Sequence, residues 1–183
     1  MIFLILIQFC FAQKNTEFIK TKNLIKVGLS TYFVEDQFVF GIALEHKIAT
    51  NKSLQLEALP LFSKNRFTTK KGIGFACSYR NYLRKSNNNL SGVYISPLVK
   101  VGAVNIKNNT NFETKVNNFN ASFLFGKQWI FENRLILDFN GGLGFFNNES
   151  SPEIIYVDDG REKFGFNRSG ISPNINIKVG YAF

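Results

Sequence analysis

The sequence contains no apolar run long enough to cross a membrane as a helix. Its longest run, MIFLILIQFCFA at residues 1–12, falls short of the roughly twenty residues that a spanning helix needs. Its length, and the polar Gln13-Lys14-Asn15 that follows, are typical of the apolar region of a secretory signal peptide. We predict a signal peptide at residues 1–12, cleaved after Ala12, and a short periplasmic segment at residues 13–23. An exported chain of this kind is expected to be a secreted protein, a periplasmic protein or a β-type membrane protein.

Cysteine is also scarce, and positive charge is not clustered. Removal of the signal peptide takes Cys10 with it and leaves Cys77 alone, which excludes an intrachain disulfide. Cys10 does not suit a lipoprotein site, because a small residue normally precedes such a cysteine and the bulky Phe9 stands there. The net charge is +9, yet no basic run exceeds Lys70-Lys71. We therefore predict no nucleic-acid binding, and expect the diffuse charge to favour anionic lipid head groups.

What the sequence has in abundance is alternation of apolar and polar residues. At the C-terminus, every second residue is apolar: Ile175, Ile177, Val179, Tyr181 and Phe183. Because successive side chains of a strand point to opposite faces, this pattern predicts a strand with one apolar face. The same pattern recurs in eight segments, at residues 24–33, 38–49, 54–62, 72–83, 93–103, 118–129, 135–145 and 174–183.

The composition of the two faces indicates which one meets water. The apolar face is nearly free of charge, with His46 and Lys127 as exceptions. The other face is rich in Gly, Ala, Ser and Asn, whereas soluble sheets usually expose more Lys and Glu. Small residues with sparse charges suit the crowded interior of a small barrel. We predict an all-β fold: an eight-stranded antiparallel up-and-down transmembrane β-barrel over residues 24–183, with its apolar face toward lipid.

The charges on the small-residue face are expected to pair inside this barrel, because a buried charge needs a partner. The predicted lumen network comprises Lys26, Glu45, Lys47, Glu57, Arg80, Lys100, Asp138 and Lys178. A polar track for a small solute is the functional alternative, although eight strands normally leave no open channel.

The connectors and aromatic residues suggest an orientation. Connectors 34–37, 63–71, 105–114 and 147–170 are expected at the outer end, and 50–53, 84–90 and 130–133 at the periplasmic end. Apart from 34–37, the outer set is the longer one, as expected of the outer loops of a bacterial β-barrel. Two interfacial aromatic girdles are predicted. One comprises Trp129, Phe131, Tyr82 and Phe183, and the other Phe33, Phe38, Phe62 and Phe145.

At this point the chain resembles a known group of proteins. The terminal Ile175, Ile177, Val179, Tyr181 and Phe183 look like the C-terminal signal by which outer-membrane proteins are recognised for barrel insertion. The FAQ junction and the stretch GKQWIFENRLILDFNGGLGF are similar to small outer-membrane β-barrel proteins of Bacteroidota, with an OmpA/OmpX-like barrel. The resemblance implies an outer-membrane location and the barrel-assembly machinery as a partner, and it indicates location more than activity.

No motif in the sequence predicts catalysis, a metal or a cofactor. His46 lacks the Ser two residues away that lipid A esterases carry, since Leu44 and Ile48 stand there. Asp158, Asp159 and Glu162 lack the spacing of a calcium loop, and a hairpin turn at Asp159-Gly160 explains them. The glycines of GIGF and GGLGF are not followed by the Lys-Ser/Thr of a phosphate-binding loop.

The sequence thus predicts a non-enzymatic, porin-like outer-membrane protein with a structural, adhesive or surface-interaction role. Its extracellular loops, chiefly residues 147–170, would make the contacts, and outer-membrane lipid and lipopolysaccharide would surround it. The extracellular ligand is not defined by the sequence. Two alternatives stay open at this stage: a narrow channel or transporter for small solutes, and a soluble lipocalin-like binder of small molecules.

Overall fold

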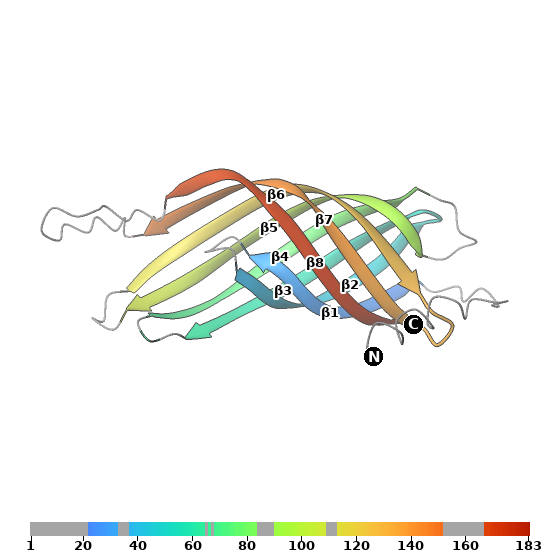
Figure 1. Ribbon diagram of the computed structural model, residues 1–183, viewed down its shortest axis with the longest axis horizontal. Coiled ribbons are helices and arrows are strands. Elements are labelled where there is room, and N and C mark those ends of the chain that lie inside the picture. Colours follow the sequence, from blue (N-terminus) through green and yellow to red (C-terminus); the bar gives the residue numbers. More distant parts are fainter. Residues whose placement is uncertain are drawn as a thin grey trace, which may run out of the picture.

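The computed structural model describes residues 22–32, 37–64, 66, 68–83, 90–108, 113–151 and 167–183. The predicted signal peptide and most of the predicted periplasmic segment lie outside these residues. The described chain forms a closed barrel in which each strand pairs with its sequence neighbours and β8 pairs with β1 (Figure 1). All of these pairings are antiparallel. The predicted fold class is confirmed.

The eight strands have the following bounds: β1 Asn23–Tyr32, β2 Gln37–Ala49, β3 Lys52–Lys64, β4 Thr68–Tyr82, β5 Gly92–Asn108, β6 Glu113–Ile130, β7 Leu135–Ser151 and β8 Arg168–Ala182. The ring closes where β8 meets β1, with Val27 opposite Val179. Backbone hydrogen bonds between Asn23 and Phe183 extend this closure to the last residue. The start of β1 and the end of β8 therefore lie at one end of the barrel.

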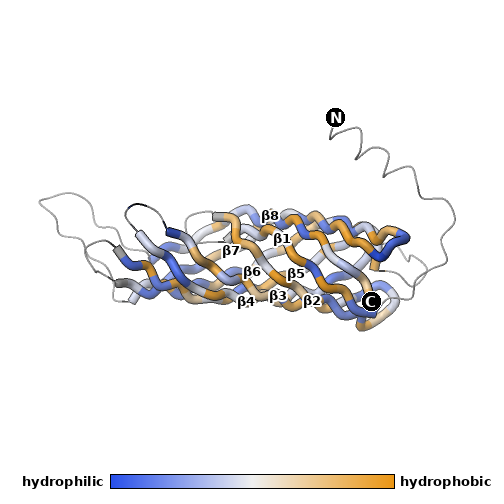
Figure 2. The backbone as a smooth tube through the Cα atoms, turned by 90° about the horizontal axis from the view of Figure 1, so that it is seen from below, coloured by the Kyte–Doolittle hydropathy of each residue, from blue (hydrophilic) through white to orange (hydrophobic). Residues whose placement is uncertain are grey.

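The two faces of the wall have the predicted orientation. Phe40, Phe123 and Val179 point outward and are more than half exposed, while Lys26 and Asp138 point inward and are fully buried. Large apolar side chains are exposed on every strand, and apolar colour alternates with polar colour along the tube (Figure 2). This exterior far exceeds the apolar patches of a few hundred Å² that water-soluble proteins expose.

An apolar exterior around a charged interior identifies the strands as membrane-spanning. Each exposed Phe or Leu would cost about 1.5–3 kcal/mol in water relative to an apolar environment. Closure of the ring pairs the backbone N–H and C=O groups at the strand edges, to which lipid could offer no hydrogen bonds. In the described part of the chain, none of the structure is a helix of the length and hydropathy that crossing a membrane requires.

The predicted connector lengths are partly wrong. Residues expected in outer loops belong to strands, since β3 ends at Lys64, β4 begins at Thr68, β5 ends at Asn108 and β6 begins at Glu113. Direct pairing explains this, because Lys64 lies opposite Thr69 and Lys107 opposite Glu113. At the other end, the connector between Tyr82 and Gly92 is longer than these two outer turns. Only the β7–β8 connector is long as predicted.

One aromatic residue was placed wrongly. Tyr82 was expected in the girdle at the short-turn end, but it points into the barrel and is 2% exposed. It shares the inward face of β4 with Arg80, two residues earlier, which the alternation requires. Phe38, Phe62, Phe145 and Phe183 are exposed on the outside as expected. Phe33 lies outside the described residues.

Two groups of buried apolar side chains lie inside the barrel, one toward each end. Toward the end predicted to be the outer one, where the β7–β8 connector lies, the strands β2 to β6 contribute an apolar lumen cluster of Val39, Leu59, Leu61, Ala76, Leu98, Val104, Ile106, Val116 and Leu124. Toward the short turns lies a second apolar group, the end cap, comprising Leu24, Tyr82, Leu90, Tyr94, Ile136 and Ala182. Charged side chains pack directly against this end cap.

Candidate functional site

Four charged residues from four strands converge inside the barrel near the short turns. Lys26 comes from β1, Glu45 from β2, Arg80 from β4 and Asp138 from β7. Each occupies an inward position of its strand, and none is more than 2% exposed. We call these four residues the charge cluster. The pleat of each strand and the closure of the ring together place them on one cross-section.

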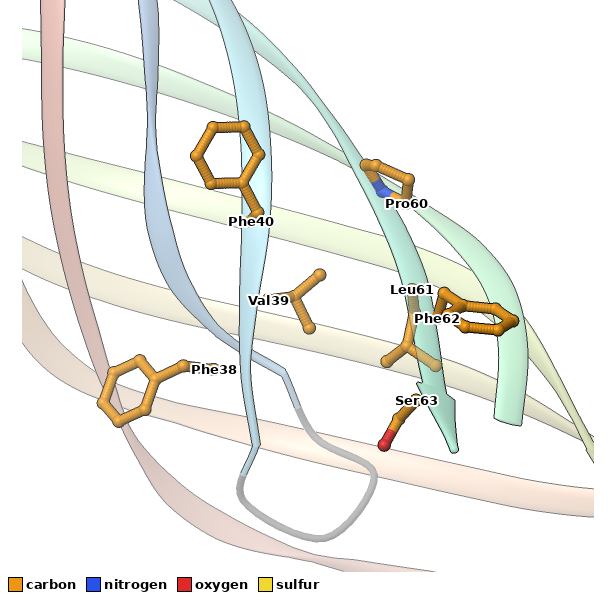
Figure 3. Close-up of a pocket in the computed structure, with 7 residues that line it drawn as sticks. All are labelled: Phe38, Val39, Phe40, Pro60, Leu61, Phe62 and Ser63. Atoms are coloured by element: carbon orange, nitrogen blue, oxygen red, sulfur yellow. The ribbon is translucent and has the colours of Figure 1, made fainter. Parts of the chain in front are cut away.

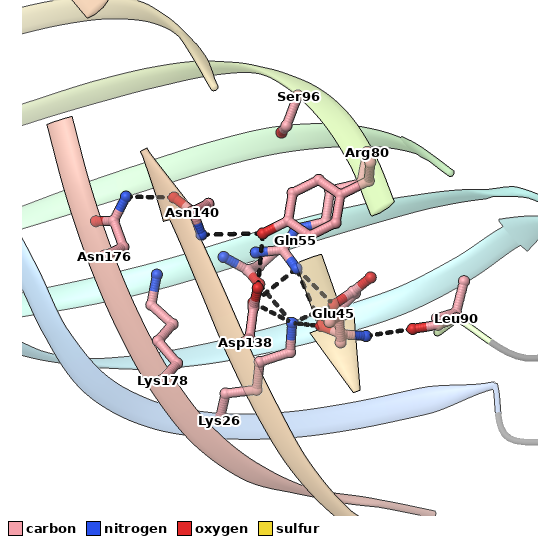
Figure 4. A network of polar contacts seen from close by, with 12 residues as sticks. Lys26, Glu45, Gln55, Arg80, Leu90, Ser96, Asp138, Asn140, Asn176 and Lys178 are labelled. Atoms are coloured by element: carbon pink, nitrogen blue, oxygen red, sulfur yellow. Dashed lines mark hydrogen bonds and ion pairs between the residues drawn. The ribbon is translucent and has the colours of Figure 1, made fainter. Parts of the chain in front are cut away.

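Each cation of the charge cluster contacts both carboxylates (Figure 4). The Lys26 ammonium lies 2.9 Å from Asp138 Oδ2 and also donates to Glu45. Arg80 Nη1 lies 2.7 Å from Asp138 Oδ2 and 3.3 Å from Glu45 Oε2. Two positive and two negative charges alternate in this arrangement, so the cluster is neutral as a unit.

Uncharged groups donate hydrogen bonds to the remaining acceptor oxygens of the carboxylates. Tyr82 donates from its hydroxyl to Glu45 Oε1 at 2.8 Å, and Tyr94 donates to Asp138 Oδ1 at 2.6 Å. The Arg80 guanidinium stacks on the Tyr94 ring, 4.4 Å from its centroid. Such charge-assisted hydrogen bonds offset the desolvation that burial imposes on the carboxylates. The two tyrosines thus join the charge cluster to the end cap.

Two glutamines complete the shell around the cations. Gln128 accepts from Arg80 at 3.1 Å through Oε1 and also accepts from Lys26, while its amide nitrogen donates to the Leu90 carbonyl at 2.6 Å. Gln55 accepts from Lys26 at 3.1 Å. With these contacts, β1 to β7 all contribute side chains or backbone to one connected network that crosses the barrel interior.

A glycine makes room for this packing. A Cβ atom at Gly126 would lie 2.7 Å from the Tyr94 hydroxyl and 2.6 Å from Asn140 Cβ. Gly126 is directly opposite Tyr94 in the β5–β6 ladder. The absence of a side chain there lets the tyrosine cross the lumen and reach Asp138.

A second set of polar groups lies nearer the outer loops. Lys178 Nζ contacts Glu57 Oε2 at 2.9 Å, and Ser30 donates to Glu57 Oε1 at 2.8 Å. Lys100 donates to the Thr31 carbonyl and to Asn174 Oδ1, both at 3.0 Å. Asparagines continue the network across the barrel, from Tyr94 through Asn140 to Asn176. The buried charges therefore form two adjacent groups.

The structure places seven of the eight residues of the predicted lumen network inside the barrel. Lys47 differs, because it lies partly exposed at the end of β2, next to the register shift between Lys47 and Ala49. The sequence reasoning did not single out Gln55, Gln128, Tyr82 and Tyr94 as network members. Their inward positions were readable from the alternation, but their contacts depend on which strands face each other across the lumen.

The arrangement of the charge cluster suits a structural role, in which it braces the strands, better than a catalytic role. Its carboxylates are held by cations and tyrosine hydroxyls, and its end-cap side is covered by apolar side chains. His46 lies outside the barrel, with Nδ1 2.7 Å from Asn23 Oδ1. Within the described ranges, no group of three or more His, Cys, Asp or Glu side chains is placed to hold a metal ion. Asp158, Asp159 and Glu162 lie outside those ranges.

Comparisons with known proteins add little beyond the fold. No protein-family model matches the chain, and no curated protein matches it. Among solved structures, the chain is similar to Ail, the attachment invasion locus protein of Yersinia pestis. The two share 8% sequence identity with a TM-score of 0.45, over 90% of this chain and all of the other.

Proposed function

We propose that this protein is a non-enzymatic outer-membrane barrel that acts through the surface it presents outside the membrane. The observation that carries the proposal is the polarity of the outward side chains near the predicted outer rim. On β5 to β8 the outward side chains become polar before the strands end, whereas farther down the same strands they are apolar. These polar outward residues are Asn105, Lys107, Lys115, Asn117, Glu149, Ser151 and Ser169.

The protruding part of this sheet has an open edge on β8. The β1–β8 ladder ends at Ser30 opposite Asn176, so residues 168–174 pair with β7 but have no ladder partner on β1 in the described chain. Ile171 lies on this stretch and is 77% exposed. An exposed strand edge is a template for adding a strand from another protein. We therefore propose strand addition at β8 as the mode of surface interaction.

The filled lumen argues against the two alternative functions. The charge cluster and the apolar lumen cluster occupy successive levels of the barrel, which disfavours a channel for solutes. A lipocalin-like binder would need a polar exterior, and the exterior of this barrel is apolar. The proposal therefore places the function on the outer rim.

A proline substitution tests the open edge. The Ile175 N–H donates to Thr31 Oγ1 on the β1 side. By strand alternation, the N–H groups of Ile171 and Ser169 face the same side, whereas Pro173 has no N–H to offer there. Ile171→Pro should remove a free-edge donor without breaking the β7 ladder, while Ser172→Pro should break that ladder. We expect cells producing Ile171→Pro to attach less to neighbouring cells than wild-type producers, in a flow-cytometric attachment assay.

The attachment assay needs two checks. Ile171→Pro must still shift mobility between unheated and boiled detergent extracts, which shows that the barrel has folded. Equal attachment of wild-type producers and cells without the protein would refute the surface role.

The location is tested separately. We propose that Ile175, Ile177, Val179, Tyr181 and Phe183 guide insertion by the barrel-assembly machinery, with Phe183 also closing the β1–β8 seam through its backbone. Deletion of Phe183 should reduce the heat-modifiable form in the outer-membrane fraction, because both the signal and the seam contact are lost. Normal insertion of the truncated chain would contradict this part of the proposal.

A further inference from the structure

Between β2 and β3, the barrel wall is split on its predicted outer side. Their ladder runs from the short turn to Ile42 opposite Ala58. Beyond this pair, no ladder partner joins the two strands in the described chain, although β2 continues toward Gln37 and β3 toward Lys64. β2 remains paired with β1 here, and β3 with β4. Pro60 lies at the split and has no N–H to give to a ladder.

A cavity of about 680 Å³ lies at this split, lined by Phe38, Val39, Phe40, Pro60, Leu61, Phe62 and Ser63 (Figure 3). The lining includes both faces of the wall. Phe38, Phe40 and Phe62 point outward and are more than half exposed, whereas Val39 and Leu61 are buried inward residues. A cavity that touches both faces of a two-sided strand pair passes into the wall instead of resting on its surface. We call it the β2–β3 slot.

The inner side of the slot is apolar and borders the apolar lumen cluster. Val39 and Leu61 belong to the apolar lumen cluster, together with Leu59 and residues of β4 to β6. The outer side opens among aromatic side chains on the lipid-facing exterior. The slot volume falls within the range of about 300–1,000 Å³ that is typical of small-molecule sites, which are mostly apolar. An occupant must therefore be apolar along the slot and able to enter from the membrane.

The rim of the slot carries positive charge. The exposed charged residues described within residues 64–71 are basic: Lys64, Arg66 and Lys71. Lys70 lies here too, but its side chain points into the barrel and is 3% exposed. The Lys71 ammonium lies 5.6 Å from the centre of the Phe62 ring, which links this basic rim to the slot lining. Lysine and arginine side chains next to an apolar cavity complement a ligand with an anionic end and a hydrocarbon body.

We propose that the β2–β3 slot binds an acyl chain of a phosphate-bearing membrane lipid, which enters sideways from the outer leaflet while its phosphate meets the basic rim. The acyl chain contacts Val39 and Leu61 inside the wall, and Phe38, Phe40 and Phe62 flank its entry. This lipid site goes beyond the surface interaction proposed above and does not depend on it.

Photo-labelling of the folded wild-type protein tests the site. The probe is phosphatidylglycerol with a diazirine near the end of one acyl chain, incorporated into phosphatidylcholine vesicles that contain the barrel. Lipid surrounding the wall reaches only outward side chains, such as Phe123 and Val179. Lipid in the slot should also label the inward residues Val39 and Leu61, located by peptide mass spectrometry. Labelling confined to outward residues would overturn the proposal.

A reversible closure of the slot provides the matched control. Continuing the β2–β3 register places Phe40 opposite Pro60, so the pair Phe40→Cys and Pro60→Cys should form a disulfide across the split. Leu44→Cys with Leu56→Cys gives the same link in the closed part of the same ladder, where these residues are partners. Both natural cysteines are replaced by serine, since Cys77 lies opposite Leu56.

The two disulfides should differ in one readout. Labelling of Leu61 should be lost in the Phe40–Pro60 variant and return after reduction, while the Leu44–Leu56 variant should label as the wild type does. Unchanged Leu61 labelling in the oxidised Phe40–Pro60 variant would overturn the proposal. Equal labelling by a phosphatidylcholine probe would overturn the role of the basic rim, because that lipid carries no net charge.

Discussion

The two levels of the barrel interior are both filled, but by opposite kinds of side chain. Near the short turns, Lys26, Glu45, Arg80 and Asp138 form a neutral cluster in which each cation contacts both carboxylates. Near the outer loops, aliphatic residues such as Leu59 and Leu124 fill the space. The wall differs as well, because β2 and β3 are paired beside the charge cluster and separated beside the apolar cluster.

This difference indicates at which level of the interior the barrel wall can open. A gap beside the charge cluster would bring ionised groups against acyl chains, at a cost of several kcal/mol for each uncompensated ion. A gap beside the apolar lumen cluster brings acyl chains against the apolar side chains of Val39 and Leu61, apart from the unpaired strand edges. The split in the β2–β3 ladder lies at the level where it costs least. The predictions below test this contrast, from the largest expected effect to the smallest.

Removal of one cation from the charge cluster should have the largest effect. Arg80→Met leaves Glu45 and Asp138 with Lys26 as the remaining cation of the cluster. Breaking a buried ion pair in this way typically costs about 3–5 kcal/mol, because an uncompensated charge stays buried. The loss is measured by urea unfolding in lipid vesicles, followed by the heat-modifiable gel shift. A loss below that of Leu59→Ala would contradict the bracing role.

Truncation in the apolar lumen cluster should cost somewhat less. Leu59 is fully buried, and Leu59→Ala removes packed methyl groups and leaves a cavity, which typically costs about 2–5 kcal/mol. Leu143→Ala, at a lipid-facing position that is 64% exposed, is the matched control. The same unfolding assay should show a clearly smaller loss for the control. Equal losses would mean that the apolar lumen cluster is not tightly packed.

Joint replacement of an ion pair should be milder than removal of one member. Lys178 and Glu57 lie 2.9 Å apart between the two levels. Lys178→Met combined with Glu57→Leu leaves no unpaired charge of this pair, and such exchanges are often close to neutral. We expect a change within about 2 kcal/mol for the double variant, and a larger loss for Glu57→Leu alone. Strictly additive single effects would show that the two residues do not interact.

A cation on the outside should matter least. Lys127 is exposed, with its ammonium 4.8 Å from the centre of the Trp129 ring. Lys127→Met removes a cation–π contact worth about 0.5–1 kcal/mol at an exposed site. The single Trp should report the change as a small shift in fluorescence, while the unfolding free energy changes by less than for Arg80→Met, Leu59→Ala or Glu57→Leu alone. A loss as large as that of Arg80→Met would remove the contrast between lumen and exterior.

Much of the fold was predictable because a strand has a repeat of two residues. Once Ile175, Ile177 and Val179 share a face, Asn176 and Lys178 must share the other, whatever the rest of the chain does. The extent of strands was less predictable. The polar residues 105–108 suggested a loop, yet ladder pairing with β6 keeps them extended above the apolar exterior. Tyr82 was misplaced because an aromatic near a strand end suits either a girdle or a lumen.

By itself, the sequence determined which side chains face lipid and which face the lumen, because alternation is a local property of the extended backbone. Only the tertiary structure decided which inward residues meet: Arg80 of β4 and Asp138 of β7 are not neighbours in the sheet, and ring closure brings them within 2.7 Å. The apolar–polar alternation is interrupted at residues 38–40 and 58–62, but this interruption did not determine the split beside Pro60. The split depends on the path each strand takes around the ring, and that path is fixed by all eight strands together.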